Sequence, residues 1–255
     1  MSSLTCSTPF DESVAQDAPA LLPLKVSQLV YAVNGTRLIN GIDLTLTADT
    51  RTVIMGANGA GKSLLLRLWH GLLTPTSGHI QWGDSVPGEA VRRRQAMVFQ
   101  RPVLLRRSVK ANLRFALELR CDTHDRPQRL AQLLELAGLS GVAHRPARVL
   151  SAGEQQRLAM VRALSLEPEV LFLDEPSASL DPASVAAIET LIRTADTGGV
   201  KIILVTHDIG QARRLADEVV FVHRGQIAEH TPASEFFQQP HSEAARAYLE
   251  GRIIV

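Results

Sequence analysis

A glycine-rich segment followed by lysine and serine constrains this chain more than any other feature. Residues 51–73 run RTVIMGANGAGKSLLLRLWHGLL: a short β-prone run, a loop and an apolar segment with helical spacing. The phosphate-loop spacing G-x-x-x-x-G-K-[ST] is present, carried by Gly56, Gly61, Lys62 and Ser63. Glycine lets a backbone turn its N–H groups toward a ligand, and a helix start adds partial positive charge. The segment therefore predicts a strand, a loop that binds polyphosphate, and a helix from Lys62.

Each residue of this loop has an expected task. Lys62 would reach the β- and γ-phosphates of a nucleotide, and the Ser63 hydroxyl would bind Mg²⁺, as in P-loop nucleotide hydrolases generally. The alternative is a tight turn that carries glycines by chance, which the flanking strand and helix pattern disfavours. The residues expected to bind the cofactor here are Gly56, Ala57, Asn58, Gly59, Ala60, Gly61, Lys62, Ser63 and Leu64.

Two carboxylates follow an apolar run in the second half of the chain. Residues 170–173 (VLFL) are typical of a strand buried on both faces of a parallel sheet, and Asp174 and Glu175 come directly after it. Ligands bind at the carboxyl ends of such strands. One carboxylate would hold Mg²⁺ while the other orients or deprotonates a water. The alternative is an acidic turn ended by Pro176.

A second apolar strand ends in a histidine. Residues 201–205 (KIILV) are followed by Thr206, His207 and Asp208. His207 could contact the γ-phosphate from this strand end, although a lone histidine after a strand is more often structural. The eight histidines of the chain show no metal-ligand spacing.

Residues 150–164 (LSAGEQQRLAMVRAL) begin with a helix-start signal. Ser151 and Glu154 have the spacing of a capping box at the start of an amphipathic helix. The same helix start offers N–H groups and a hydroxyl to an anion, so a second phosphate-binding surface is the functional alternative.

The segments around these motifs predict two smaller units. Between residues 24 and 46, β-prone runs are broken at Asn34-Gly35 and Asn40-Gly41, which predicts antiparallel hairpins. Tyr31 lies in this β lobe and could stack on an adenine or pack against its strand neighbours. Helical apolar spacing over residues 108–119 and 127–136 predicts a helical lobe inserted at residues 101 to about 150.

Composition excludes several classes of protein. The net charge is +1, from 27 Lys and Arg against 26 Asp and Glu, so the basic field typical of nucleic-acid binding is missing. Cys6 and Cys121 are too few for a disulfide framework, which favours the cytoplasm. No signal-peptide core and no apolar run long enough to span a membrane occurs. Residues 1–22 lack periodicity and are predicted to form a flexible tail.

The chain resembles the nucleotide-binding subunit of ATP-binding cassette (ABC) transporters. The resemblance is carried, in chain order, by GANGAGKS, the glutamine of VFQ, LSAGEQQR, VLFLDEP, SLD and VTHD. The resemblance spans about residues 24–225. The LSxGE helix between phosphate loop and acidic strand separates this family from other P-loop proteins. The resemblance implies an α/β P-loop NTPase fold over residues 23–255, with a RecA-like parallel-sheet core, an N-terminal antiparallel β lobe and the inserted helical lobe.

The resemblance also implies how the nucleotide is bound. Tyr31 would stack on the adenine of ATP. Asp174 would be the acidic Mg²⁺ residue and Glu175 the general base. His207 would contact the γ-phosphate. Gln100, at the end of the strand AMVFQ, could ligate Mg²⁺ or a water from its position alone, although a glutamine at a strand end is usually only solvated. The resemblance implies that Gln100 is the third catalytic residue and senses the nucleotide towards the membrane partner.

A second set of residues would act across a dimer. The resemblance implies that Ser151 and Gly153 contact the ATP held by the opposite protomer, and that Asp181 makes an inter-protomer contact. Glu154 belongs to the same ATP-binding motif. The chain departs from the family pattern at Ala152, where a glycine is usual.

The resemblance further implies the partners. A cassette without its own membrane span is similar to importer subunits, which pair with a separate integral-membrane permease and a solute-binding protein at the inner face of the membrane. The segment EHTPASEFFQQPHSEAARAYLEG resembles importers of oxyanions such as tungstate and phosphate. The alternative is a soluble cassette of a non-transport machine, such as iron–sulfur cluster assembly, and a neighbouring permease gene would decide between the two.

Overall fold

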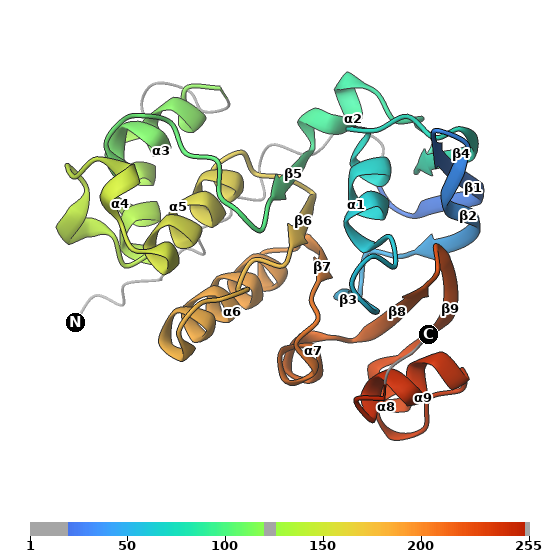
Figure 1. Cartoon of the computed structure of the whole chain (residues 1–255). Helices are drawn as coiled ribbons and strands as arrows, with labels where there is room; N and C mark the ends of the chain where they lie inside the picture. The colour runs from blue at the N-terminus through green and yellow to red at the C-terminus, as the bar shows by residue number, and fades with distance from the viewer. Residues whose placement is uncertain (1–19, 120–125, 253–255) are drawn as a thin grey trace, which may run out of the picture.

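The computed structural model describes residues 20–119 and 126–252 (Figure 1). Cys6, Cys121 and most of the predicted tail lie outside this part. Within it, every helix is too short or too polar to span a bilayer.

A six-stranded sheet forms the centre of the molecule (Figure 1). Its strand order is β5-β6-β7-β3-β8-β9, and all neighbouring pairs from β5 to β8 are parallel, while β9 runs antiparallel to β8. Parallel strands end at one edge of a sheet, so the segments that follow β5, β6, β7 and β3 lie side by side. The predicted parallel α/β core is confirmed. The strands are β3 (Thr52–Met55), β5 (Gln95–Val98), β6 (Val170–Asp174), β7 (Lys201–Val205), β8 (Glu218–His223) and β9 (Gln226–Pro232).

Helices cover both faces of this sheet. The helix α5 packs against α3 and α4 of the helical lobe and also against α6 and β5, so it joins that lobe to the core. The helix α5 begins at Ala152, just after the predicted end of the inserted lobe near residue 150. The helices are α1 (Lys62–His70), α2 (Glu89–Arg93), α3 (Val109–Leu117), α4 (Arg126–Leu136), α5 (Ala152–Leu164), α6 (Pro182–Thr197), α7 (Ile209–Leu215), α8 (Ala233–Gln238) and α9 (Glu243–Leu249), with 3₁₀ turns at Ser140–Val142 and Ala147–Val149.

The two faces of the sheet belong to two apolar cores. Every residue of β6 is buried, as its continuous apolar run predicts. Because side chains alternate along a strand, Val170 and Phe172 pack with α1 and the β lobe, whereas Leu171 and Leu173 pack with the helical lobe, α5 and α6. The strand β6 thus holds the two halves of the molecule together.

The β lobe is a three-stranded antiparallel sheet of order β2-β1-β4, formed by Leu24–Val33, Thr36–Leu46 and Ser77–Trp82. The hairpin predicted at Asn34-Gly35 is confirmed, because Val33 pairs with Thr36. The break predicted at Asn40-Gly41 is wrong, since β2 continues through it. Gly41 has φ 68° at a register shift of the β1–β2 pairing. The dipeptide therefore forms a β-bulge within the strand instead of a turn.

The predicted tail ends earlier than residue 22. Leu21 is 1% exposed and packs in the core of the β lobe and α1. Its backbone N–H donates to a carboxylate oxygen of Glu169 at 3.4 Å. The apolar residues at the end of this segment are therefore part of the folded core.

Candidate functional site

The loop after β3 has a backbone that only glycine fits at two positions. Gly56 has φ 145°, and a Cβ added there would lie 2.1 Å from the carbonyl oxygen of Val222. Gly61 has φ 107°, and its added Cβ would lie 2.8 Å from Cδ1 of Ile39. Both residues combine a left-handed backbone with a close neighbour, so the glycine spacing has a steric cause.

Neighbouring strands hold this loop in place. The N–H of Gly225, in the β8–β9 turn, donates to the Ala60 carbonyl at 3.0 Å, and the N–H of Asn40 donates to the Gly225 carbonyl at 2.9 Å. Asn58 and Gly59 are exposed at the tip, while Ala57 is half-buried. The loop is thus anchored on one side and open at its tip.

Lys62 lies folded into the loop. Its side chain is buried, and Nζ donates to the carbonyl oxygens of Gly56 at 2.8 Å and Ala57 at 2.9 Å. Burial lowers the pKa of Lys62, and the carboxylates Glu175 and Asp174 oppose that shift. The loop therefore surrounds an ammonium group.

The start of α1 adds backbone donors beside that ammonium group. Gly61 is the N-cap and has no side chain to accept hydrogen bonds from the first turn. The first N–H groups of a helix have no partner within the helix, so those of Ser63 and Leu64 suit an anion in the loop. The arrangement as a whole fits a polyphosphate.

The Ser63 hydroxyl bonds to the first of the two predicted carboxylates. Its Oγ donates to Oδ1 of Asp174 at 2.7 Å. Burial raises the pKa of Asp174, and the hydrogen bond from Ser63 opposes that rise. A hydroxyl and a carboxylate beside a phosphate loop are the hard oxygen ligands that Mg²⁺ prefers. These two residues therefore fit a magnesium ion.

The structure brings the three predicted catalytic residues together. Nδ1 of His207 lies 3.1 Å from Oε2 of Glu175, and Nε2 of Gln100 lies 3.4 Å from the same oxygen. Glu175 has φ 49°, which is uncommon for a residue with a side chain. Its N–H donates to the Val205 carbonyl at 3.0 Å, which ties the end of β6 to β7.

Ser151 and Glu154 form the predicted capping box at the start of α5. The Glu154 N–H donates to Ser151 Oγ at 3.3 Å, and the Ser151 N–H donates to Oε2 of Glu154 at 2.8 Å. The backbone N–H and the hydroxyl of Ser151 both donate to the Glu154 carboxylate and lower its pKa. Ser151 and Ala152 remain exposed, so the capping role leaves this helix start accessible.

Gly153 has a packing role that the sequence did not reveal. It is buried, and a Cβ added there would lie 2.1 Å from Oγ of Ser184 in α6. The same Ser184 donates its hydroxyl to Asp181 at 2.6 Å, and Asp181 caps α6. Glycine at 153 therefore allows α5 to approach the start of α6.

Tyr31 lies in the β lobe next to the strand that touches the loop. It pairs across the β1–β2 hairpin with Ile39, the residue against which a side chain at Gly61 would clash. The ring is half-buried and packs on the core of the β lobe. Tyr31 thus packs within the β lobe, and its stacking on adenine stays a prediction.

Two contacts of the site were missed in the sequence. The Tyr248 hydroxyl, in α9, donates to the His207 carbonyl at 3.2 Å, and burial raises the pKa of that tyrosine. Ser177, two residues after Glu175, bonds to the side chain of Gln211. No motif marks these residues, because each contact joins segments that are far apart in the chain.

Comparisons with known proteins agree with this geometry. Residues 39–178 match the family model described as ABC transporter. A phosphate import ATP-binding protein from Natronomonas pharaonis is 33% identical over 248 residues, which cover 91% of this chain and 87% of the relative. A nickel import ATP-binding protein from Rhodobacter capsulatus is 39% identical, covering 80% and 87%.

A solved structure resembles the fold as well. It is part of an ABC transporter complex from Clostridium perfringens, with a TM-score of 0.77 and 30% identity, covering 87% of this chain and 92% of that one. The chain belongs to the ABC transporter family and is one of its ATPase subunits.

Proposed function

We propose that this chain is the ATP-binding subunit of an importer and that it hydrolyses ATP to drive solute uptake through a separate permease. The observation that carries the proposal is that Lys62, Ser63–Asp174 and Glu175–His207 meet at one edge of the central sheet. The import names of the relatives support the direction of transport. They do not favour the alternative of a non-transport machine.

The residues divide the work of hydrolysis. Lys62 and the N–H groups of the loop bind the phosphates, and Ser63 with Asp174 would hold Mg²⁺. The bound ion would neutralise charge that develops on the phosphates. Glu175 accepts a proton from the attacking water, and His207 and Gln100 keep its carboxylate in place.

We further propose that each ATP site is completed by a second copy of the chain. In one chain, α1 packs with the β lobe and α5 with the helical lobe, on opposite faces of the sheet (Figure 1). Ser151 and Asp181 are exposed at helix starts and so are available to a partner. In an isologous interface each chain offers the same surface to the other, so Ser151 and Asp181 of each chain reach the ATP site of its partner. Two complete sites therefore form together, or none does.

This arrangement predicts that the specific ATPase activity of the isolated chain falls on dilution, because dissociation of the dimer opens both sites. The measurement is a dilution series of ATPase rates with light scattering on the same samples. Mixing Ser151→Arg with Lys62→Ala should also restore part of the activity, since the heterodimer keeps one complete site. Constant specific activity in a sample shown to be monomeric would mean that one chain hydrolyses ATP alone.

A cleft of about 500 Å³ beside the helical lobe suits the permease. Its lining is mostly apolar and comes from β5, α3, α5 and the segment between β5 and α3. Val103 and Leu119 at its edge are 69% and 65% exposed, and Phe115 is 40% exposed. Exposed apolar side chains around a cleft are a feature of protein interaction sites. We propose that a segment of the permease docks here.

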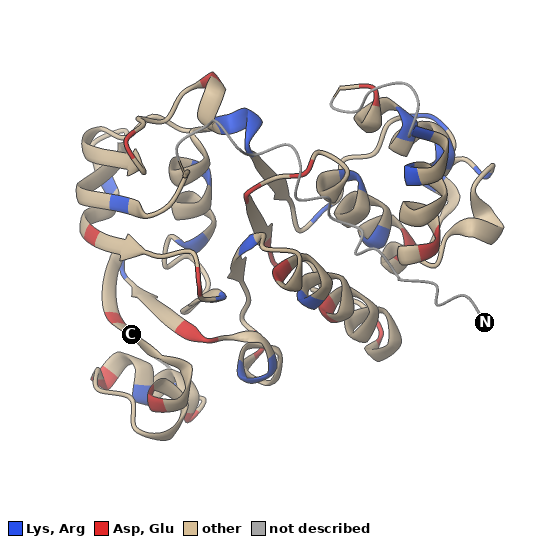
Figure 2. Ribbon diagram, turned by 180° about the vertical axis from the view of Figure 1, so that it is seen from behind, with Lys and Arg blue, Asp and Glu red and all other residues tan. Residues whose placement is uncertain are grey.

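Basic residues occur along the helical lobe, where Figure 2 draws them blue, and Arg92 and Arg162 line the cleft. The Arg107 guanidinium lies 5.7 Å from the centre of the Phe115 ring. Arg106 and Arg107 are both exposed. They could therefore contact an acidic or carbonyl-rich partner segment.

The double variant Arg106→Glu, Arg107→Glu is expected to lower recovery with the permease in membranes and to lower ATP-driven uptake. The introduced carboxylates would repel the acidic or carbonyl-rich partner segment that the two arginines attract. The ATPase rate of the isolated chain should stay unchanged. Lys25→Glu, on the exposed face of the β lobe, is the matched control. If the double variant binds membranes and supports uptake as the control does, the permease docks elsewhere.

We propose an oxyanion as the solute, delivered by a solute-binding protein to a permease at the inner face of the membrane. The C-terminal segment and the phosphate-import relative support this class, while the nickel-import relative belongs to another. The measurement is uptake of phosphate, tungstate and Ni²⁺ by cells that carry the chain with its permease. Uptake of phosphate or tungstate would support an oxyanion, and uptake of Ni²⁺ alone would contradict it.

A further inference from the structure

Two loops at the edge of the central sheet carry Glu175 and His207, the two catalytic residues that contact each other. The β6–α6 loop (residues 175–181) begins with Glu175 and ends with Asp181, the cap of α6. The β7–α7 segment (residues 206–208) contains His207 and leads into α7, whose first turn contains Gln211. Anything that fixes one loop against the other therefore fixes the distance between Glu175 and His207.

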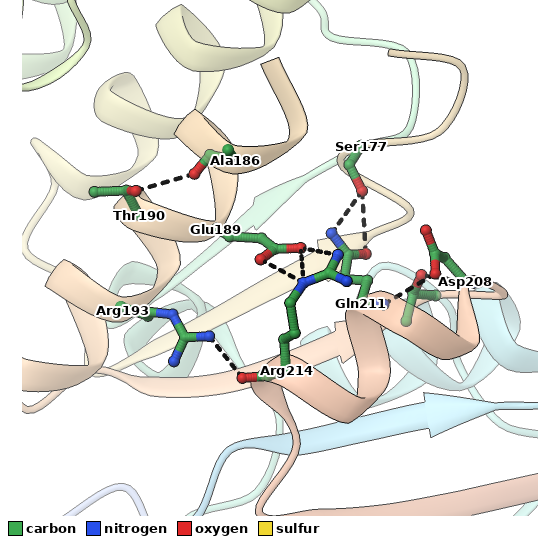
Figure 3. A network of polar contacts seen from close by, with 9 residues as sticks. Ser177, Ala186, Glu189, Thr190, Arg193, Asp208, Gln211 and Arg214 are labelled. Carbon is green, nitrogen blue, oxygen red and sulfur yellow. Dashed lines mark hydrogen bonds and ion pairs between the residues drawn. The ribbon is translucent and has the colours of Figure 1, made fainter. Parts of the chain in front are cut away.

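Gln211 joins these two loops (Figure 3). It is 0% exposed. Its Oε1 accepts from the Ser177 hydroxyl at 3.0 Å, and its Nε2 donates to the same Oγ at 2.8 Å. Its backbone N–H donates to Oδ1 of Asp208 at 2.9 Å. A buried amide is expensive without partners, so the contact with Ser177 is strongly preferred in the folded state.

Ser177 occupies the middle of the β6–α6 loop. Its carbonyl accepts from the Leu180 N–H at 3.3 Å, and the Ala178 N–H donates to the Glu175 carbonyl at 3.2 Å. Glu175 and Ser179 have φ of 49° and 63°. Residues with side chains keep such angles only when surrounding contacts hold them. The bond from Gln211 is one such contact, placed between the two unfavourable residues.

We infer that Gln211 is a positioning residue for hydrolysis, which holds Glu175 against His207 through the hydroxyl of Ser177. The inference rests on the proposed ATPase function. The contacts close a ring from Glu175 through Ser177, Gln211 and Asp208 to His207, and the 3.1 Å contact between His207 and Glu175 completes it. Removing the Gln211 amide opens this ring at its buried side.

The packing of α6 on α7 does not depend on Gln211. Nη2 of Arg214 lies 2.6 Å from Oε1 of Glu189, and Nε lies 3.0 Å from Oε2 (Figure 3). Nη2 of Arg193 also donates to the Arg214 carbonyl at 2.7 Å. These bonds hold the two helices together independently, so loss of the Gln211 amide should act on the loops.

The test compares Gln211→Leu, Ser177→Ala and the double variant in the full chain. Each single variant is expected to lower kcat by about 10-fold or more, because small displacements of a catalytic group are costly. The KM for ATP should change by less than about twofold, since the phosphate loop is untouched. The double variant should be no slower than the slower single variant, because both remove one shared contact. Ser177→Thr keeps the hydroxyl and should recover most of the rate.

Glu189→Gln is the matched control, because it weakens the same helix pair away from the loops. It should lower the melting temperature and leave kcat unchanged. Wild-type kcat in Gln211→Leu and Ser177→Ala, additive losses in the double variant, or an equal loss in Glu189→Gln would overturn the inference. A wild-type chain that does not hydrolyse ATP would instead reject the proposed function.

Discussion

Replacing Lys62 by alanine is expected to abolish ATP hydrolysis. The Lys62 ammonium group donates to the carbonyls of Gly56 and Ala57. When ATP binds, this group would donate to the β- and γ-phosphates instead, and alanine has no group that can do so. Loss of one preorganised group at developing charge typically costs about 100-fold or more. We therefore expect the rate of phosphate release from purified Lys62→Ala to fall to background in a coupled assay.

The control for this variant must separate folding from chemistry, because Lys62 is buried. Circular dichroism and thermal melting of Lys62→Ala without nucleotide should show a folded chain. Mg-ATP should raise the melting temperature of the wild type but not of the variant, since ligand binding stabilises the folded state. Lys110→Ala, on the exposed side of α3, should match the wild type throughout. Full turnover by Lys62→Ala would reject the loop as the phosphate site.

Sequence motifs were sufficient where the chemistry is local. The loop after β3 could be predicted because phosphate binding needs glycines, a lysine and a hydroxyl at fixed spacing. The strand β6 could be predicted because burial on both faces requires a continuous apolar run. The capping box at Ser151 follows from a spacing of three residues along one helix. In each case the determinant lies within a few residues of its effect.

Other features depend on segments that meet only in the folded chain. Gly153 is required by the approach of Ser184, and no pattern around residue 153 indicates which helix will pack there. The pair Ser177–Gln211 is 34 residues apart in sequence. The break at Asn40-Gly41 was misjudged because the same dipeptide serves a hairpin turn or a bulge, and the partner strand decides between them.

Replacing Glu175 by glutamine is expected to separate ATP binding from hydrolysis. Glutamine has nearly the same shape, so contacts at the position of Oε2 with His207 and Gln100 can persist. The amide cannot accept a proton from water, and the rate should fall by about 100-fold or more, as for loss of a general base. Lys62, Ser63 and Asp174 are unchanged, so affinity for Mg-ATP should remain close to that of the wild type.

Such a variant should accumulate as an ATP-bound dimer. If ATP is bound between Lys62 of one chain and Ser151 of its partner, nucleotide joins the two chains until hydrolysis releases them. Slow hydrolysis then prolongs the lifetime of the dimer, and size-exclusion chromatography with light scattering should show the dimer in Mg-ATP but not in Mg-ADP.

Glu89→Gln, which alters an exposed ion pair on α2, controls for the loss of one negative charge. A monomer in Mg-ATP together with a normal rate of hydrolysis would contradict both the role of Glu175 and the composite site. A slow monomer would contradict only the composite site, because the base would be correctly assigned while the nucleotide stays within one chain.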